Sequence, residues 1–265
     1  MMPIIDLHQH APTPDGLDAR VQACRDAGIV TAVILGQPES RVPGDNALTL
    51  AAARAYPTLF RAWYGVDMDA DGPDAITRAR DVGFTGVKCI GPKRAYNDPG
   101  YFPLYERAAD LQLPVLFHLG IVANTPGYQD CDSNLMRAIH LDHLARCLPE
   151  LTLIGAHFGN PWPEEAAMAC RWNPNLYFDL SGSLLKYRRP AFLGELLWWK
   201  ADGPYAAPDR SDAWAKIVFG SDVASPAIAD VVNDYAIVMD TLKLDDGLCC
   251  RIWHDTAARI VGPPA

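Results

Sequence analysis

The stretch Ile4-Ile5-Asp6-Leu7-His8-Gln9-His10 begins with apolar residues and ends in a His-x-His pair. Side chains alternate along a strand, so His8 and His10 are expected to point to the same face. Two imidazoles at this spacing can reach one metal ion. Later apolar runs also end in His or Asp. This segment therefore predicts both the first strand of the fold and one part of a larger site.

Seven further runs of the same kind follow. They are short, rich in β-branched residues and mostly continuous rather than alternating, which is typical of parallel strands buried on both faces. The eight predicted strands are Ile4–His10, Thr31–Leu35, Phe60–Val66, Gly86–Ile90, Pro114–His118, Leu151–His157, Leu176–Leu180 and Lys216–Ser221. Helix-forming residues at helical spacing fill Leu17–Ala27, Asn46–Ala55, Pro73–Asp81, Tyr101–Leu111, Leu135–Cys147, Trp162–Arg171, Pro226–Leu242 and Gly247–Val261.

This alternation predicts an α/β fold, a (β/α)8 TIM barrel that forms one domain over residues 1–265. The alternative is an open doubly wound sheet. It is disfavoured because no Gly-x-Gly-x-x-Gly loop follows the first strand and because polar residues end several separate strands. Two predicted connections, Leu119–Asn134 and Ser181–Ala213, are longer than usual for this class. Both would lie over the carboxyl ends of the strands, where long loops are candidate substrate lids.

Composition narrows the class of protein. The chain is 49% hydrophobic and 21% charged, as in ordinary globular proteins. A net charge of −9 without a basic block argues against nucleic-acid and membrane-surface partners. No apolar run approaches the length of about 18 residues that a membrane span needs, and the start lacks a signal-peptide pattern. The seven cysteines, without a Cys-x-x-Cys pair, predict reduced thiols in a cytoplasmic protein.

Five side chains that can bind metal end predicted strands: His8, His10, His118, His157 and Asp222. In a barrel the carboxyl ends of the strands face one shared mouth, so these side chains are expected to converge there. Each alone has a structural explanation, as a hydrogen-bonded core histidine or as an aspartate in a turn or helix cap. Together, several buried imidazoles and a carboxylate without partners would be costly. The sequence therefore predicts a metal site at the mouth.

Seven segments form an ordered set along nearly the whole chain. They are Asp6-Leu7-His8-Gln9-His10, Gly86-Val87-Lys88, His118-Leu119-Gly120, Ala156-His157-Phe158-Gly159-Asn160-Pro161-Trp162, Tyr177-Phe178-Asp179-Leu180-Ser181-Gly182, Phe219-Gly220-Ser221-Asp222 and Asp255-Thr256-Ala257-Ala258-Arg259-Ile260. With this set the chain resembles the amidohydrolase superfamily, and specifically its amidohydrolase-related (amidohydrolase 2) branch, which includes aminocarboxymuconate-semialdehyde decarboxylase-like enzymes, hydrolases and lactonases. The family usually has Asn where this chain has Asp255.

The resemblance implies a mononuclear site in which His8, His10, His118 and Asp222 are the ligands and water completes the coordination. His157 would be a catalytic histidine or an additional ligand. Three histidines and a carboxylate suit zinc, although manganese, iron and cobalt remain open by ligand type. A homodimer is also in keeping with the resemblance.

The expected chemistry is the hydrolysis of an amide, lactone or ester in a small carboxylate-bearing or cyclic substrate. A bound ion lowers the pKa of water, Asp222 can move the proton, and His157 can hydrogen-bond an oxygen that gains negative charge. The alternative is nonoxidative decarboxylation of a small unsaturated or aromatic acid, with Asp222 or His157 protonating the carbon. A remote alternative is a catalytically silent barrel used for binding.

Three residues are candidate substrate contacts: Lys88, Trp162 and Arg188. Lys88 would bind a substrate carboxylate. Its alternatives are a carboxylated lysine that bridges two metals and a side chain that faces the helices. Trp162 would form an apolar wall, with core packing as its alternative. Arg188 would meet an anionic substrate or lie in a solvated loop. Asp179 and Ser181, near the end of the seventh predicted strand, would support the site through hydrogen bonds or serve the fold alone.

Overall fold

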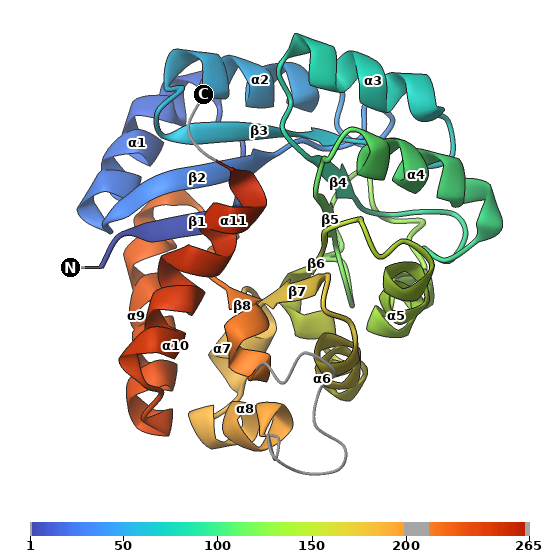
Figure 1. The fold of residues 1–265 in the computed structure, drawn as a ribbon. Helices are drawn as coiled ribbons and strands as arrows, with labels where there is room; N and C mark the ends of the chain where they lie inside the picture. Colours follow the sequence, from blue (N-terminus) through green and yellow to red (C-terminus); the bar gives the residue numbers. More distant parts are fainter. Residues whose placement is uncertain (1, 199–211, 263–265) are drawn as a thin grey trace.

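The computed structural model describes residues 2–198 and 212–262. Eight strands lie in chain order, and each pairs in parallel with the next. Figure 1 shows them arranged around a common centre with helices outside. The TIM-barrel prediction is confirmed, and the open doubly wound alternative is wrong. The strands are β1 Ile4–His10, β2 Ile29–Leu35, β3 Phe60–Gly65, β4 Val87–Cys89, β5 Val115–Phe117, β6 Leu153–Gly155, β7 Leu176–Asp179 and β8 Ile217–Val218.

The helices begin and end where the sequence supplies the appropriate residues. In α3, for example, Pro73 opens the first turn and Gly83 ends the helix with φ 117°. The α-helices are α1 Leu17–Asp26, α2 Asp45–Ala55, α3 Pro73–Val82, α4 Phe102–Asp110, α5 Ala138–Cys147, α6 Pro163–Trp172, α7 Ser183–Tyr187, α8 Pro190–Leu197, α9 Ile228–Leu242, α10 Asp246–Cys250 and α11 Thr256–Val261. A π-helical turn over Arg251–Asp255 joins α10 to α11.

Two apolar layers hold the barrel together. The larger one lies between the strands and the surrounding helices. The smaller one fills the barrel interior with side chains from six strands, including Leu7, Leu35, Trp63 and Leu116. The last helix, α11, packs against this interior, and Thr256 at its start donates a hydrogen bond to the carbonyl of Ala215, just before β8. It therefore closes the end where the strands begin, as Figure 1 shows.

The first strand contains an irregularity that matters for the site. Its pairing with β2 shifts between Asp6 and Gln9, as in a β-bulge. Leu7 packs in the barrel interior, so strict alternation would turn His8 outward. The shift restores the inward direction, because His10 pairs with Leu35, whose side chain lies in the interior. The pairing shift is thus what brings the His-x-His pair to the inside of the barrel.

The two long connections differ from one another. The prediction that Ser181–Ala213 is a lid is wrong for α8, which packs against α6 and α9 with Leu193 and Leu197 buried. Those two leucines are one helical turn apart, so the segment forms a barrel helix. Residues 199–211 lie outside the described residues. The other connection, Leu119–Asn134, has no α-helix and contacts the loop after β2.

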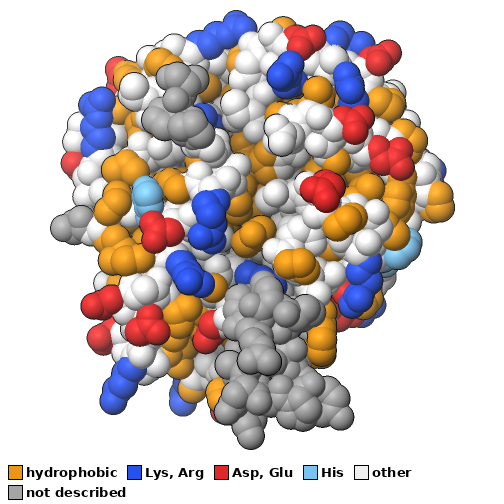
Figure 2. Space-filling model, viewed as in Figure 1, with side chains coloured by type: hydrophobic (Ala, Val, Ile, Leu, Met, Phe, Trp, Pro, Cys, Tyr) orange, Lys and Arg blue, Asp and Glu red, His pale blue; other side chains and the backbone are white. Residues whose placement is uncertain are grey.

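Two surface properties bear on partners. Lys and Arg side chains are interspersed with Asp and Glu over the coloured residues of the face in Figure 2, without a basic block. Of the helices within residues 2–198 and 212–262, none is long and apolar enough to cross a membrane.

All seven cysteines lie in the described ranges, and each is a free thiol.

Candidate metal centre

Three of the predicted ligands come together where the two ends of the barrel sheet meet. His8 and His10 end β1, and Asp222 follows β8. The Asp222 Oδ1 atom lies 3.3 Å from His10 Nε2 and 3.6 Å from His8 Nε2. His8 is 1% exposed, whereas the side chains of His10 and Asp222 keep 34% and 24% of their surface exposed. The cluster is therefore anchored in the interior and open to the mouth.

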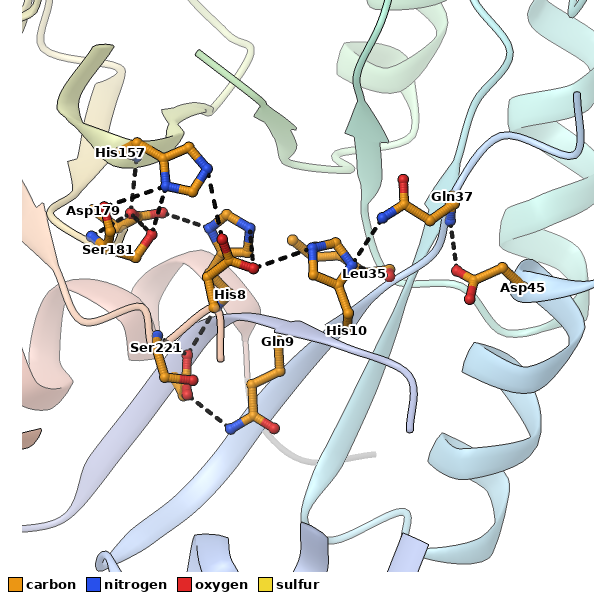
Figure 3. Close-up of polar contacts among 12 residues, drawn as sticks. His8, Gln9, His10, Leu35, Gln37, Asp45, His157, Asp179, Ser181 and Ser221 are labelled. Carbon is orange, nitrogen blue, oxygen red and sulfur yellow. Dashed lines mark hydrogen bonds and ion pairs between the residues drawn. The ribbon is translucent and has the colours of Figure 1, made fainter. Parts of the chain in front are cut away.

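The outer nitrogens of the two histidines are held by other groups. His8 Nδ1 lies 2.9 Å from Asp179 Oδ2 (Figure 3). Because a carboxylate only accepts hydrogen bonds, His8 Nδ1 is assigned the proton, and His8 Nε2 directs a lone pair toward Asp222. His10 Nδ1 lies 3.2 Å from the carbonyl oxygen of Leu35, an acceptor, and 3.1 Å from the amide nitrogen of Gln37, a donor, so these contacts allow either tautomer of His10. Metal-binding histidines are commonly oriented in this way by a group on the second nitrogen.

Asp179 connects the histidines that come from different strands. It is fully buried. Its Oδ1 accepts the backbone N–H groups of His157 at 3.0 Å and Ser181 at 2.9 Å, together with the Ser181 hydroxyl. Burial alone would raise the pKa of Asp179, but the charge and hydrogen bond of His8 together with the charge of His157 hold it well below its usual range. Asp179 is thus an ionised carboxylate that receives several hydrogen bonds.

The state of His157 follows from Asp179. Since the Ser181 hydroxyl donates to Asp179, its oxygen can only accept from His157 Nδ1, which lies 2.9 Å away. His157 Nδ1 therefore carries a proton, and Nε2 presents a lone pair 3.7 Å from Asp222 Oδ2. Neutral His157 is thus a hydrogen-bond acceptor or a ligand, and only its protonated form can donate to a substrate oxygen.

His118 lies beside this cluster rather than in it. Its ring centroid is 4.8 Å from that of His157. Two trios have ligand atoms within 4.8 Å of one another, His8–His10–Asp222 and His8–His157–Asp179, and His118 belongs to neither. Burial, with the nearby positive charges of His157 and Lys88, holds the pKa of His118 well below its usual value. Its buried Nε2 has no hydrogen-bond partner among the described residues, and such an atom calls for a bound partner.

These groups fit a divalent cation. Burial would raise the pKa of Asp222, but His8, His10 and His157 together hold it well below its usual range. The carboxylate is therefore ionised, and it lies 3.3–3.7 Å from the Nε2 atoms of His8, His10 and His157. Three imidazoles and one carboxylate are a common donor set for such an ion, so the His/Asp group could bind a metal.

Glycine is required where two of these groups meet. A Cβ added at Gly220 would lie 2.9 Å from the Cβ of His8 and 3.0 Å from that of Asp179. Any larger residue would push these side chains apart. Gly220 thus allows β8 to pass close beneath the hydrogen bond between His8 and Asp179.

Lys88 points into the barrel. It pairs with Leu116, whose side chain lies in the interior layer, so the alternative that it faces the helices is wrong. The side chain is fully buried, and Nζ has no hydrogen-bond partner among the described residues. Burial lowers the pKa of Lys88 to about 8, and the negative charges of Asp222 and Asp179 oppose this shift. Lys88 is thus a buried amine in the electrostatic field of the site.

The other two candidate substrate contacts have partners elsewhere. The guanidinium of Arg137 stacks on the Trp162 ring at 4.8 Å, and that of Arg188 lies 4.8 Å from the centroid of Phe192. No hydrogen bond, ion pair or ring contact joins Trp162 or Arg188 to the histidine cluster within the described ranges. Their roles stay predictions.

Sequence reasoning missed the contacts that fix the Leu119–Asn134 loop. Arg41 donates to the carbonyls of Gly127 and Gly91, each at 2.8 Å, and pairs with Asp130. The hydroxyl of Tyr128 donates to Gln37, whose amide nitrogen lies 3.1 Å from His10 Nδ1. The contacts of Arg41 and Gln37 with this loop join positions 86–91 residues apart, and they leave no local pattern in the sequence. The loop thereby reaches a candidate ligand.

A cavity of about 370 Å³ lies beside that loop. It is beyond the carboxyl ends of β2, β3 and β4, so it belongs to the same face of the barrel as the histidine cluster. Its lining includes Arg41, Asp67, Ile90, Lys93 and Asp130. The volume and the mixed charges of this cavity suit the polar part of a small molecule.

Comparison with solved structures supports the fold. An uncharacterised TIM-barrel protein from Bordetella bronchiseptica is 20% identical with a TM-score of 0.73, and the match covers 98% of each chain. The 5-carboxyvanillate decarboxylase from Sphingomonas paucimobilis is 13% identical with a TM-score of 0.69, over 98% of this chain and 99% of the other. A Pseudomonas putida protein assigned as a 2-pyrone-4,6-dicarboxylic acid hydrolase is 18% identical with a TM-score of 0.68, over 99% and 98%.

Comparison of sequences identifies the family. No curated protein matches the chain significantly. The model of the amidohydrolase family, however, matches residues 5–262, which include every candidate ligand and all of the strands except the first residue of β1. The prediction of an enzyme with this ancestry is confirmed. The chain therefore belongs to the amidohydrolase family of metal-dependent enzymes.

Proposed function

We propose that this protein is a hydrolase that holds one divalent ion, zinc, with His8, His10, His118 and Asp222. The observation that carries the proposal is that the Nε2 atoms of two imidazoles lie 3.3 and 3.6 Å from one ionised carboxylate, with the Nδ1 atom of His8 held by Asp179 and that of His10 held by Leu35 and Gln37. Nitrogen donors with a single carboxylate suit zinc. When bound, the ion lowers the pKa of water and polarises a carbonyl.

The residues of the chain supply the proton transfers. Asp222 is ionised and partly open to the mouth, so it can accept the proton of the attacking water and return it to the leaving group. His157 presents Nε2 beside it and can share that proton. Lys88 would pair with a carboxylate of the substrate, while Trp162 and Arg188 would contact its outer parts. The substrate would be a small amide, lactone or ester that is cyclic or bears a carboxylate.

A decarboxylase is the second candidate. The unpaired amine of Lys88 in the field of the site supports it, because an ammonium group there can hold a substrate carboxylate. In this reaction Asp222 or His157 would first take a proton from water and then give it to the substrate carbon. A C–H bond would form, the C–C bond would break, and carbon dioxide would leave, with hydroxide remaining from the water.

Isotope labelling distinguishes the two reactions. Purified protein would be screened against small lactones, amides and aromatic acids in water enriched in ¹⁸O. A hydrolase places one ¹⁸O in the product and releases no carbon dioxide, whereas the reverse pattern removes the hydrolase proposal. Dialysis against a chelator is expected to abolish turnover, and added zinc to restore it. Pure protein that binds no divalent ion and does not respond to zinc would contradict both candidates.

Replacing Lys88 tests its proposed role. Lys88→Met keeps the length of the side chain and removes the charge. We expect KM for a carboxylate-bearing substrate to rise by about 10-fold or more, since a charge-assisted contact contributes about 1.5–3 kcal/mol. KM for the uncharged ester of the same substrate should change less. An equal change for both substrates in steady-state kinetics would show that Lys88 does not recognise the anion.

Three further points belong to the proposal. Residues 1–265 form one catalytic domain, the enzyme is a homodimer, and it works in the cytoplasm on a small molecule. The seven free thiols support the compartment. The net charge of −9 supports the expectation that nucleic acids are not partners. Gel filtration with light scattering would test the dimer.

A further inference from the structure

Three candidate ligands, His8, His10 and Asp222, lie at the seam between β1 and β8, and few backbone hydrogen bonds cross this seam. Leu7 donates to the carbonyl of Phe219 at 2.9 Å, and Asp222 donates to that of His8 at 2.7 Å. The sheet pairs each strand with the next from β1 to β8, but the pairing shift in β1 and the early end of β8 interrupt regular pairing here. Two buried backbone N–H groups, those of His8 and Ser221, therefore need another acceptor.

Asp6 supplies that acceptor. Its Oδ1 atom lies 3.0 Å from the backbone nitrogen of His8 and 3.0 Å from that of Ser221. Asp6 is fully buried, so these bonds are shielded from competing water. Ser221 directly precedes Asp222. One carboxylate oxygen thus bonds to the backbone of one candidate ligand and to the residue before another.

The second oxygen of Asp6 is held from the opposite side. Gln9 donates its side-chain amide to Oδ2 at 2.7 Å, and Arg20 of α1 donates to the side-chain Oε1 atom of Gln9 at 3.3 Å. Figure 3 shows Gln9 below the strand and His8 above it. Because Gln9 fixes the carboxylate in one orientation, Oδ1 can serve both amides. Arg20 is buried, and its positive charge partly offsets the charge of Asp6, to which it is linked through Gln9.

We propose that Asp6 is a positioning residue of the metal centre. By accepting both amides with one oxygen, it sets the backbone of His8 at a fixed distance from that of Asp222. It would touch neither the ion nor the substrate. The effect of Asp6 on metal binding rests on the proposed metal site. Its effect on the backbone of His8 and Ser221 can be measured without any ion.

Two substitutions separate the acceptor from the charge. Asp6→Asn keeps an oxygen that can accept both amides, whereas Asp6→Ala removes it. In the full-length protein without zinc, we expect the amide protons of His8 and Ser221 to exchange at least about 10-fold faster in Asp6→Ala. They should remain within a few-fold of wild type in Asp6→Asn. If Asp6→Ala does not fold, Asp6→Thr takes its place, because its single short oxygen cannot replace the shared acceptor.

Zinc binding provides the second measurement, by competition with a coloured chelator. We expect an affinity about 10- to 100-fold weaker in Asp6→Ala and near wild type in Asp6→Asn. Unchanged exchange in Asp6→Ala, or unchanged zinc affinity despite faster exchange, would overturn the positioning role. A wild-type protein that binds no zinc would overturn the proposed function instead, and the exchange rates would then decide the claim about the seam alone.

Discussion

Replacing Asp222 by asparagine is expected to lower kcat/KM by about 10²–10⁴-fold. The substitution preserves shape but removes the charge that faces His8 and His10 at 3.6 and 3.3 Å. It also removes the group that would accept the proton of water. Zinc affinity should fall as well, because an amide is a weaker ligand than a carboxylate. Steady-state kinetics and zinc competition measure the two losses separately.

His143→Ala is the control for this variant. His143 is exposed on α5, and its ring lies 6.1 Å from that of Phe102, away from the mouth. Its removal should leave kcat/KM within about twofold, since surface substitutions usually have small effects. Equal losses in Asp222→Asn and His143→Ala would mean that the assignment of the site is wrong.

Asp179→Ala is expected to damage both the fold and the site. The variant leaves four donors without their acceptor, on His8, His157 and Ser181. Loss of one partner from a buried charged network costs about 3–5 kcal/mol of unfolding free energy. The imidazole of His8 would also lose the group that keeps its proton on Nδ1. Zinc affinity should therefore fall by about 10- to 100-fold.

The control for Asp179→Ala is Asp110→Ala at the end of α4, where the carboxylate is 70% exposed. Its unfolding free energy in urea should lie within about 0.5 kcal/mol of wild type. If Asp179→Ala unfolds at the same urea concentration as wild type and binds zinc equally well, the hydrogen bonds of Asp179 stabilise neither the fold nor the metal site.

Much of the fold could be predicted because parallel strands leave a strong local pattern. Continuous apolar runs marked all eight strands, and their regular alternation with helices fixed the barrel. Boundaries were less accurate where the chain turns to present a site residue. The predicted sixth strand extended to His157, but β6 ends at Gly155 and His157 has φ 58°. The predicted eighth strand extended to Ser221, but β8 ends at Val218 and Asp222 has φ 47°.

The sequence predicted three side chains that the structure brings together, but it did not predict their arrangement. Strand ends indicated His8, His10 and Asp222, which the structure brings together. The tautomers depend on contacts such as that between His8 and Asp179, which are 171 positions apart. No local pattern encodes such a contact. Asp6 was visible in the first motif, yet its role arises only from the pairing shift in β1 and the approach of Ser221.

Anomalous diffraction from crystals grown with zinc tests the central claim most directly. Data collected on both sides of the zinc absorption edge locate the ion without reference to activity. We expect one strong peak within ligand distance of His8 Nε2, His10 Nε2, His118 and the Asp222 carboxylate. The proposed metal site would be contradicted by a peak that these residues do not surround or by two peaks bridged by Lys88. It would also be contradicted by the absence of a peak in crystals of protein that binds zinc in solution.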